Sequence, residues 1–170
     1  MTCNIIHIRE ANSADVSLLC RLVRQSYQDV AKRFELTSTN CPKHPSNCSD
    51  EWIENDFARG VSYFILEHKA MPAGCVAIES ANADLCYLER LSVLPRERKK
   101  GFGGRLVEHV FGIAKKRRAK KISIGIIAEQ SELKKWYQKF GFVEGVGRVD
   151  NKFFIATVKM LKGQEAKKAI

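Results

Sequence analysis

Residues 91–110 are LSVLPRERKKGFGGRLVEHV, in which an apolar run ends at a proline and is followed by basic residues and three glycines. The glycines, Gly101, Gly103 and Gly104, stand where a helical pattern of apolar residues begins. The first N–H groups of a helix have no partner within it and carry partial positive charge, and glycine lets a ligand approach them closely. The segment therefore predicts a strand, a turn and a helix start that binds a phosphate. The alternative is a tight turn whose basic side chains are only solvated.

The segments on both sides of this stretch predict one α/β domain with a mixed sheet. Upstream, a strand and two helices precede three strand-like runs with short turns, which predicts an antiparallel meander. The helix and strand that follow imply a right-handed parallel crossover. The expected strands are 4–9, 61–68, 73–80, 84–93, 121–128, 141–146 and 153–161, and the expected helices are 13–33 (N-cap Ser13), 49–60 (N-cap Ser49), 101–118 and 131–140.

Length and composition fit a single domain. With 170 residues, 45% of them hydrophobic, we expect one domain over residues 1–162 and a flexible tail over 163–170. Polar residues interrupt every apolar run near the start, and no later window approaches the length of a membrane span. We therefore expect a cytoplasmic protein without a membrane partner. The six cysteines then favour free thiols over a disulfide framework.

The formal net charge of +10 is concentrated in one segment. Residues 96–121 hold eleven Lys or Arg against two Glu, so the rest of the chain is about neutral. A nucleic-acid-binding protein that uses this segment is one alternative function. However, the aromatic residues of the segment, Phe102 and Phe111, fall on the apolar stripe of the expected helix and not among the basic residues. Nucleic acid is therefore not the partner that we expect.

Two motifs resemble those of a known family. Arg98-x-x-Gly101-x-Gly103 follows a strand and opens a helix, and WYQKFGF at 136–142 closes a later helix. Over about residues 4–161, these motifs and the order of the elements resemble the GNAT acyltransferase superfamily. The resemblance implies the GNAT fold, in which a mixed, mostly antiparallel sheet of six to seven strands is flanked by about four helices. It also implies transfer of an acyl group from acetyl-CoA, or from another acyl-CoA, to an amine.

The same resemblance implies the residues that would bind acetyl-CoA. Backbone N–H groups of the turn and helix start would bind the pyrophosphate, and the edge of the preceding strand would pair with the pantetheine arm. The family often has Asn at the position of Gln130. The implied residues are Leu91, Ser92, Val93, Arg98, Lys99, Lys100, Gly101, Phe102, Gly103, Gly104 and Gln130, and Lys99, Lys100 or Arg105 could contact the 3′-phosphate.

Acyl transfer to an amine requires a base, because an alkylamine with a pKa of ~10 is protonated near neutral pH. Glu89 is the candidate base, and a period of two predicts that it shares a strand face with Tyr87, Leu91 and Val93. Family members often carry an acid on this strand that acts through water. The alternative is a structural ion pair of Glu89 with Arg90 or with another basic residue nearby.

The departing thiolate requires a proton donor. Tyr137 occupies the position of the family's tyrosine, four residues before Gly141, and is the candidate general acid. The alternative is that Tyr137 is only a packed aromatic ring between Trp136 and Phe140.

By the family resemblance, the loop at 35–50, between the first two helices, would help to form the acceptor pocket. Residues of this loop and Glu79 are further candidates for the base. The loop contains Cys41-x-x-His44-x-x-x-Cys48, a spacing that could hold a metal, although a fourth ligand is missing and no metal is expected. The alternatives are a loop that faces the substrate and a structural loop stiffened by proline.

The sequence thus predicts an acetyl-CoA-dependent N-acetyltransferase that acts by direct attack in a ternary complex. The expected acceptor is a primary amine of a small molecule, an amino acid, or a peptide or protein. A second copy of the chain, in a homodimer, is a further candidate partner. The alternative to an enzyme is a CoA-binding module that lacks catalysis.

Overall fold

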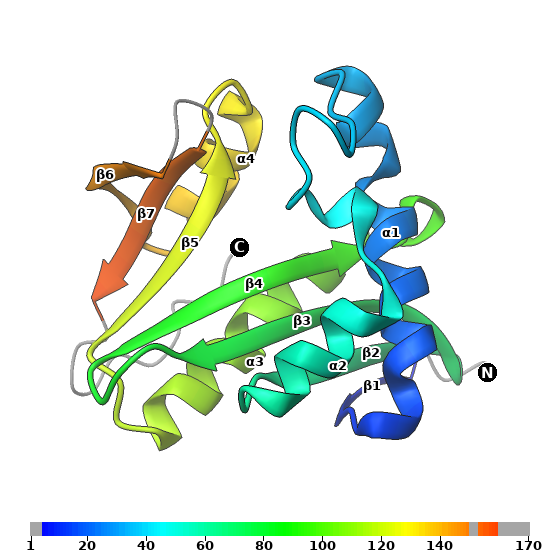
Figure 1. The fold of residues 1–170 in the computed structure, drawn as a ribbon. Helices are drawn as coiled ribbons and strands as arrows, with labels where there is room; N and C mark the ends of the chain where they lie inside the picture. Colours follow the sequence, from blue (N-terminus) through cyan, green and yellow to red (C-terminus); the bar gives the residue numbers. More distant parts are fainter. Residues whose placement is uncertain (1–4, 150–152, 160–170) are drawn as a thin grey trace. The chain divides into compact units, whose positions relative to one another are not determined.

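The computed structural model describes residues 5–149 and 153–159. The helices and strands that were expected are present, with ends within a few residues of the predicted ones, and the tail at 163–170 lies outside the described residues. The helices are α1 (Val16–Arg33), α2 (Asp50–Ala58), α3 (Phe102–Lys116) and α4 (Ser131–Gln138), and the strands are β1 (Ile6–Glu10), β2 (Ser62–His68), β3 (Met71–Ser80), β4 (Leu85–Val93), β5 (Lys121–Ile127), β6 (Val143–Val149) and β7 (Phe153–Lys159) (Figure 1).

The seven strands hydrogen-bond in the order β1-β2-β3-β4-β5-β7-β6. Strands β1 and β2, β2 and β3, β5 and β7, and β6 and β7 are antiparallel, whereas β4 and β5 are parallel. Strands β4 and β5 are the parallel pair that the crossover through α3 connects. A mixed, mostly antiparallel sheet with four helices is the fold class that the sequence predicts.

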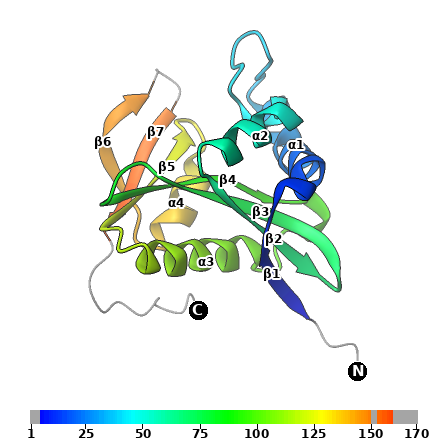
Figure 2. The ribbon, with the colours of Figure 1, turned by 60° about the horizontal axis from the view of Figure 1, so that its bottom comes forward.

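The chain divides into two compact units, one of residues 1–78 and 90–109 and the other of residues 79–89 and 110–170. In the first unit, α1 and α2 lie on one face of β1–β3, and the first half of α3 lies on the other face (Figure 2). Buried residues of α1, α2, β2 and β3 form its main core, with Leu19, Val23, Ile53, Tyr63 and Ile65 almost or completely inaccessible to solvent. This apolar layer fixes α1 and α2 against the sheet.

In the second unit, the first part of β4 pairs with β5, from Leu85 opposite Lys121 to Tyr87 opposite Ser123. Strand β7 lies between β5 and β6 in the hydrogen-bonded order. Helix α4 covers one face of β5 (Figures 1 and 2). Phe142 links the second half of α3 to α4, because its ring contacts both Phe111 and Tyr137.

Side-chain caps are present at the turn that leads into α1 and at the start of α2. Ser49 caps α2 as predicted, since its hydroxyl accepts a hydrogen bond from the N–H of Trp52. The predicted cap at Ser13 is wrong, because Asn12 caps a 3₁₀ turn (η1, Ser13–Asp15) that leads into α1, and Asp15 completes the capping box. Within the ranges that the structure describes, no helix is long and apolar enough to cross a membrane.

Strand β4 has an irregular backbone at Arg90. The φ angle of Arg90 is 52°, a left-handed conformation that is uncommon for a residue other than glycine. Such a residue interrupts the alternation of side chains along a strand. The face of Glu89 therefore does not follow from a count of two through Leu91 and Val93, as the sequence argument assumed.

Candidate active site

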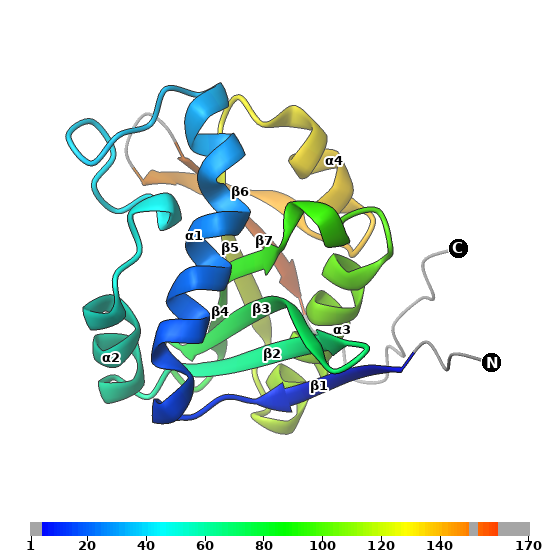
Figure 3. The same ribbon diagram turned by 90° about the vertical axis from the view of Figure 1, so that its right-hand side faces the viewer.

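The turn between β4 and α3 is built so that the helix starts in a fixed place beside α1 (Figure 3). Leu94 is buried and its N–H donates to the carbonyl of Ala73 on β3. The 3₁₀ turn η3 (Pro95–Glu97) follows, and Gly101 then adopts a φ of 79°, for which glycine has no steric penalty. Phe102, only 3% exposed, packs edge-on against His68 and anchors the first residue of α3.

The start of α3 offers backbone donors to a ligand. The first hydrogen bond of the helical ladder runs from the N–H of Arg105 to the carbonyl of Gly101, at 3.2 Å. The N–H groups of Phe102, Gly103 and Gly104 precede this bond and have no place in the ladder. They lie at the positive end of a helix of 15 residues. Donors of this kind fit a phosphate or diphosphate group.

The guanidinium of Arg98 is used within the protein. It pairs with Asp29 on α1, donates to the carbonyl of Ser26 at 2.6 Å and donates to the carbonyl of Val93 at 3.2 Å. This pairing lowers the pKa of Asp29 below its usual value. The sequence predicts Arg98 as a ligand residue, whereas its side chain ties the turn to α1. The side chain of Arg98 therefore holds the backbone of the turn in place.

The remaining basic residues of the turn differ in their partners. Lys100 donates to Glu97 at 2.9 Å, and Glu97 is also 3.1 Å from Nδ1 of His68. These contacts, Lys100 first, lower the pKa of Glu97. Lys99 and Arg105 are exposed, so their charges can act on a ligand at the helix start.

The end of β4 is held by side chains from outside the sheet. The hydroxyl of Tyr27 on α1 donates to the carbonyl of Leu91 at 2.9 Å. On the other edge of β4, strand β3 approaches so closely that a Cβ on Gly74 would lie 2.3 Å from the carbonyl oxygen of Ser92. The predicted pantetheine edge, Leu91 to Val93, is thus in contact with both α1 and β3 within the first unit.

Tyr137 lies in the second unit, on α4. It is 6% exposed, and its ring contacts those of Trp136 and Phe142 with centroids 4.9 and 5.5 Å away. Gly141, with a φ of 90°, allows the chain to leave the helix and bring Phe142 back to this cluster. The packed ring fits both interpretations of Tyr137. A purely structural ring would make these contacts, and a proton donor would need them to hold its hydroxyl in one direction. Gln130 is half-buried at the N-cap of α4.

Glu89 is half-buried near the middle of β4. Nε of Arg90, the residue that follows Glu89, donates to Asp56 of α2 at 3.1 Å. Asp56 was missed by the sequence argument. The sequence contained a signal for it, because Asp56 stands three residues after Ile53 and therefore on the apolar side of the predicted helix. In the structure Asp56 is 3% exposed.

The loop before α2 is folded on itself. His44 is 2% exposed, packs edge-on against Tyr27, and its Nδ1 lies 2.8 Å from the hydroxyl of Ser46. Asn47 donates to the carbonyl of Cys41 at 3.1 Å. In the part of the chain that the structure describes, no three His, Cys, Asp or Glu side chains are grouped as a metal site. Burial lowers the pKa of His44.

Most of the chain matches one known protein family. Residues 25–142, which include the β4–α3 turn and Tyr137, match the Acetyltransferase (GNAT) family. No curated protein is similar enough in sequence to give a match.

Solved structures share the fold. The chain is similar to PaiA N-acetyltransferase from Thermoplasma acidophilum in complex with coenzyme A, with a TM-score of 0.79, 19% identity, and coverage of 92% of this chain and 99% of that one. It is also similar to the ribosomal-protein-S18-alanine N-acetyltransferase from Escherichia coli (TM-score 0.74, 14% identity, 95% and 97% covered). A GNAT family acetyltransferase from Elizabethkingia anophelis with acetyl-CoA bound has a TM-score of 0.62 at 16% identity, with 91% and 98% covered.

Proposed function

Because the chain belongs to the GNAT acetyltransferase family, we propose that it is an N-acetyltransferase that moves an acetyl group from acetyl-CoA to a primary amine. The acceptor is an amine of a small molecule, an amino acid or a protein. The observation that carries this proposal is the start of α3, where the N–H groups of Phe102 to Gly104 precede the helical ladder behind a turn fixed by Arg98. Structural neighbours that contain CoA or acetyl-CoA support it.

The proposed cofactor site uses the backbone more than the basic side chains. The N–H groups from Lys99 to Gly104 would bind the pyrophosphate, and exposed Lys99 and Arg105 would attract the 3′-phosphate. Leu91 to Val93 would pair with the pantetheine arm as an added strand. Gln130 offers an amide that can donate and accept a hydrogen bond to the same arm.

The proposed chemistry is direct attack of the amine on the thioester in a ternary complex. When bound, acetyl-CoA supplies the activated acetyl group. Glu89 would remove a proton from the amine, through a water molecule, before or during attack. Tyr137 would donate its phenolic proton to the sulfur as the C–S bond breaks. Both roles follow the positions of the two residues in the family pattern.

The first test is to measure CoA binding by calorimetry and thiol release from acetyl-CoA with a panel of amines, amino acids and peptides. We expect saturable binding of CoA and acceptor-dependent thiol release. Binding without thiol release for any acceptor would favour a CoA-binding module that lacks catalysis. Absence of both would refute the proposed function, and salt-sensitive binding of DNA or RNA in their place would favour the nucleic-acid alternative.

Replacement of Arg98 tests whether this residue positions the site. Arg98→Ala removes the hydrogen bonds to Asp29, Ser26 and Val93 that hold the turn. We expect the affinity for CoA to fall about tenfold, which is the effect of losing about one charge-assisted hydrogen bond. Asp29→Asn should cause a smaller fall. The pairing with Arg98 depresses the pKa of Asp29 in the folded protein. The stability that this pair contributes to the folded state is therefore fully present above the pKa of Asp29 in the unfolded chain, and it is lost as the pH falls through the lower pKa of the folded protein.

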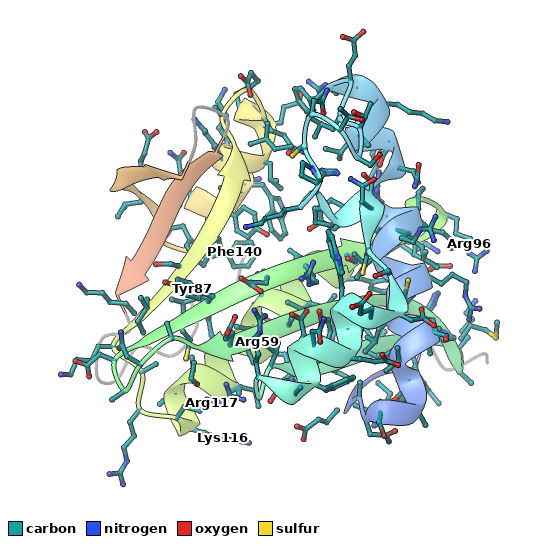
Figure 4. The ribbon with its side chains drawn as sticks, viewed as in Figure 1. Arg59, Tyr87, Arg96, Lys116, Arg117 and Phe140 are labelled. Carbon is teal, nitrogen blue, oxygen red and sulfur yellow. The ribbon has the colours of Figure 1, made fainter. Side chains whose placement is uncertain are left out.

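The matched control is Arg96→Ala. The side chain of Arg96 is 72% exposed and points away from the protein (Figure 4), so its loss should leave CoA affinity within about twofold. Equal affinities for Arg98→Ala and the wild-type protein would show that the turn holds its shape without Arg98.

A further inference from the structure

A groove between α1 and the start of α2 has no part in the proposed cofactor site. It lies within the first unit, where the two helices are neighbours (Figure 3), and it has a volume of about 420 Å³. Sites for small molecules have volumes of about 300 to 1,000 Å³. The polar residues that line the groove are Ser17, Arg21, Arg24, Gln25 and Gln28 of α1 and Asp50 of α2.

The groove is open to solvent along the exposed side of α1. Ser17, Arg21, Arg24 and Gln28 recur at the spacing of one helix face, and all four are exposed. Leu19 is buried in the core on the other side of the helix. A ligand can therefore reach the groove without any movement of the core.

Hydrogen bonds join α1 to the chain before α2 at both ends of the groove. At one end, the hydroxyl of Ser17 donates to the carboxylate of Asp50 at 2.6 Å. At the other end, Nε2 of Gln28 donates to the carbonyl of Ser46 at 3.5 Å. Eleven residues of helix separate Ser17 from Gln28, which corresponds to ~16 Å along the axis. The groove is thus elongated and has defined ends.

The acid of the groove is stabilised within the protein. Asp50 is the first residue of α2, where the partial positive charge of the helix start favours an anion. The hydrogen bond from Ser17 is the main cause of a lowered pKa of Asp50, and the positive charge of Arg24 contributes to it. The carboxylate is therefore ionised, and it has further lone pairs with which to accept hydrogen bonds from a ligand.

The two arginines of the groove are neighbours on the same helix face. Neither Arg21 nor Arg24 has an acid three or four positions away on α1. Among the residues that the structure describes, neither guanidinium forms a hydrogen bond or an ion pair. Like charges at this spacing repel each other and weaken a helix slightly. An anion bound by both guanidinium groups would remove this repulsion.

The chemistry of the lining selects one class of anion. A phosphate monoester has a charge near −2 and three acceptor oxygens, which match two guanidinium groups, whereas a single carboxylate matches one. The amide of Gln25 and the carboxylate of Asp50 can hydrogen-bond to hydroxyl groups. We propose that the groove binds a phosphate monoester whose organic part carries hydroxyl groups, such as a sugar phosphate. Acetyl transfer is not required for this inference.

Calorimetry of the whole chain with ribose 5-phosphate, ribose and inorganic phosphate tests the proposal. Excess CoA is present, so that the start of α3 is not available to the probes. We expect ribose 5-phosphate to bind with a Kd about tenfold or more below those of ribose and inorganic phosphate. Absence of binding would overturn the proposal. Equal Kd values for ribose 5-phosphate and inorganic phosphate would show a simple ion site and overturn it as well.

Single substitutions test whether the two arginines hold the phosphate. Arg21→Gln and Arg24→Gln should each raise the Kd for ribose 5-phosphate about tenfold, and Arg24→Lys should recover part of the loss because it keeps the charge without the fork. The matched control is Lys32→Gln, which removes one exposed positive charge from α1 outside the groove and should change the Kd by less than about twofold. An unchanged Kd in both arginine variants, or an equal loss in the control, would refute the assignment.

Chemical-shift mapping by NMR separates this inference from the proposed function. We expect ribose 5-phosphate to shift the backbone amide signals of residues 17–28 and of Asp50. Shifts confined to residues 102–104 would place the phosphate at the proposed cofactor site and overturn the inference. Shifts along α1 in a protein that releases no thiol from acetyl-CoA would support the groove and refute only the acetyl transfer.

Discussion

Gly74→Ala is expected to lower the free energy of unfolding by about 3 kcal/mol or more. A Cβ at this position would lie 2.3 Å from the carbonyl oxygen of Ser92, and both that atom and its neighbours belong to the backbone of β4. A flexible side chain could turn away, whereas β3 and β4 must move apart. For a chain of 170 residues this corresponds to a fall in Tm of about 10 °C, measured by calorimetry or circular dichroism.

The same substitution should weaken CoA binding, which gives it a second readout. The backbone displaced at Ser92 lies between Leu91 and Val93, where we propose that the pantetheine arm pairs. The matched control is Gly112→Ala on α3, whose added Cβ would meet nothing within 4 Å. Alanine is the better helix former, so this variant should be neutral or more stable by up to ~1 kcal/mol. Equal stability of Gly74→Ala and the wild-type protein would show that the two strands separate at little cost.

Most of the fold could be predicted because its signals are local. The period of the apolar residues changes between helical and strand-like segments, and turn residues mark the ends, so the order of elements follows from short windows of sequence. Ser49 as a cap is a local signal and was correct. The error at Ser13 is local too: Asn12 and Asp15 form a reciprocal capping box that one candidate residue does not reveal.

The contacts that fix the site could not be predicted in this way. Arg98 belongs to a recognisable motif, but its partner Asp29 lies 69 positions earlier in the chain. Arg90 and Asp56 are 34 positions apart, and nothing in the sequence around Arg90 predicts a left-handed residue within a strand. Pairs of this kind depend on how helices pack on the sheet. The sequence therefore indicates the helix start whose backbone N–H groups could bind a phosphate, whereas the structure shows which charged side chains are paired within the protein.

Tyr137→Phe is expected to lower kcat about 100- to 1000-fold while CoA still binds. The variant removes only the hydroxyl, so the ring contacts with Trp136 and Phe142 remain, and the free energy of unfolding should change by about 1 kcal/mol or less. If Tyr137 donates the proton to the thiolate, its loss makes the departing sulfur a poorer leaving group and leaves the ground-state complex intact. The loss should therefore appear in kcat and not in the Kd for CoA.

Thiol release under saturating acetyl-CoA and acceptor, together with calorimetry of CoA binding, separates the two interpretations of Tyr137. A packed aromatic residue predicts an unchanged kcat, because phenylalanine fills the same space. Tyr87→Phe is the matched control, since Tyr87 is 38% exposed and loses the same hydroxyl. A normal rate for Tyr137→Phe, with normal CoA binding, would remove Tyr137 from the chemistry and require another proton donor. A normal rate for Tyr87→Phe, together with a reduced rate for Tyr137→Phe, would assign the loss of rate to the hydroxyl of Tyr137.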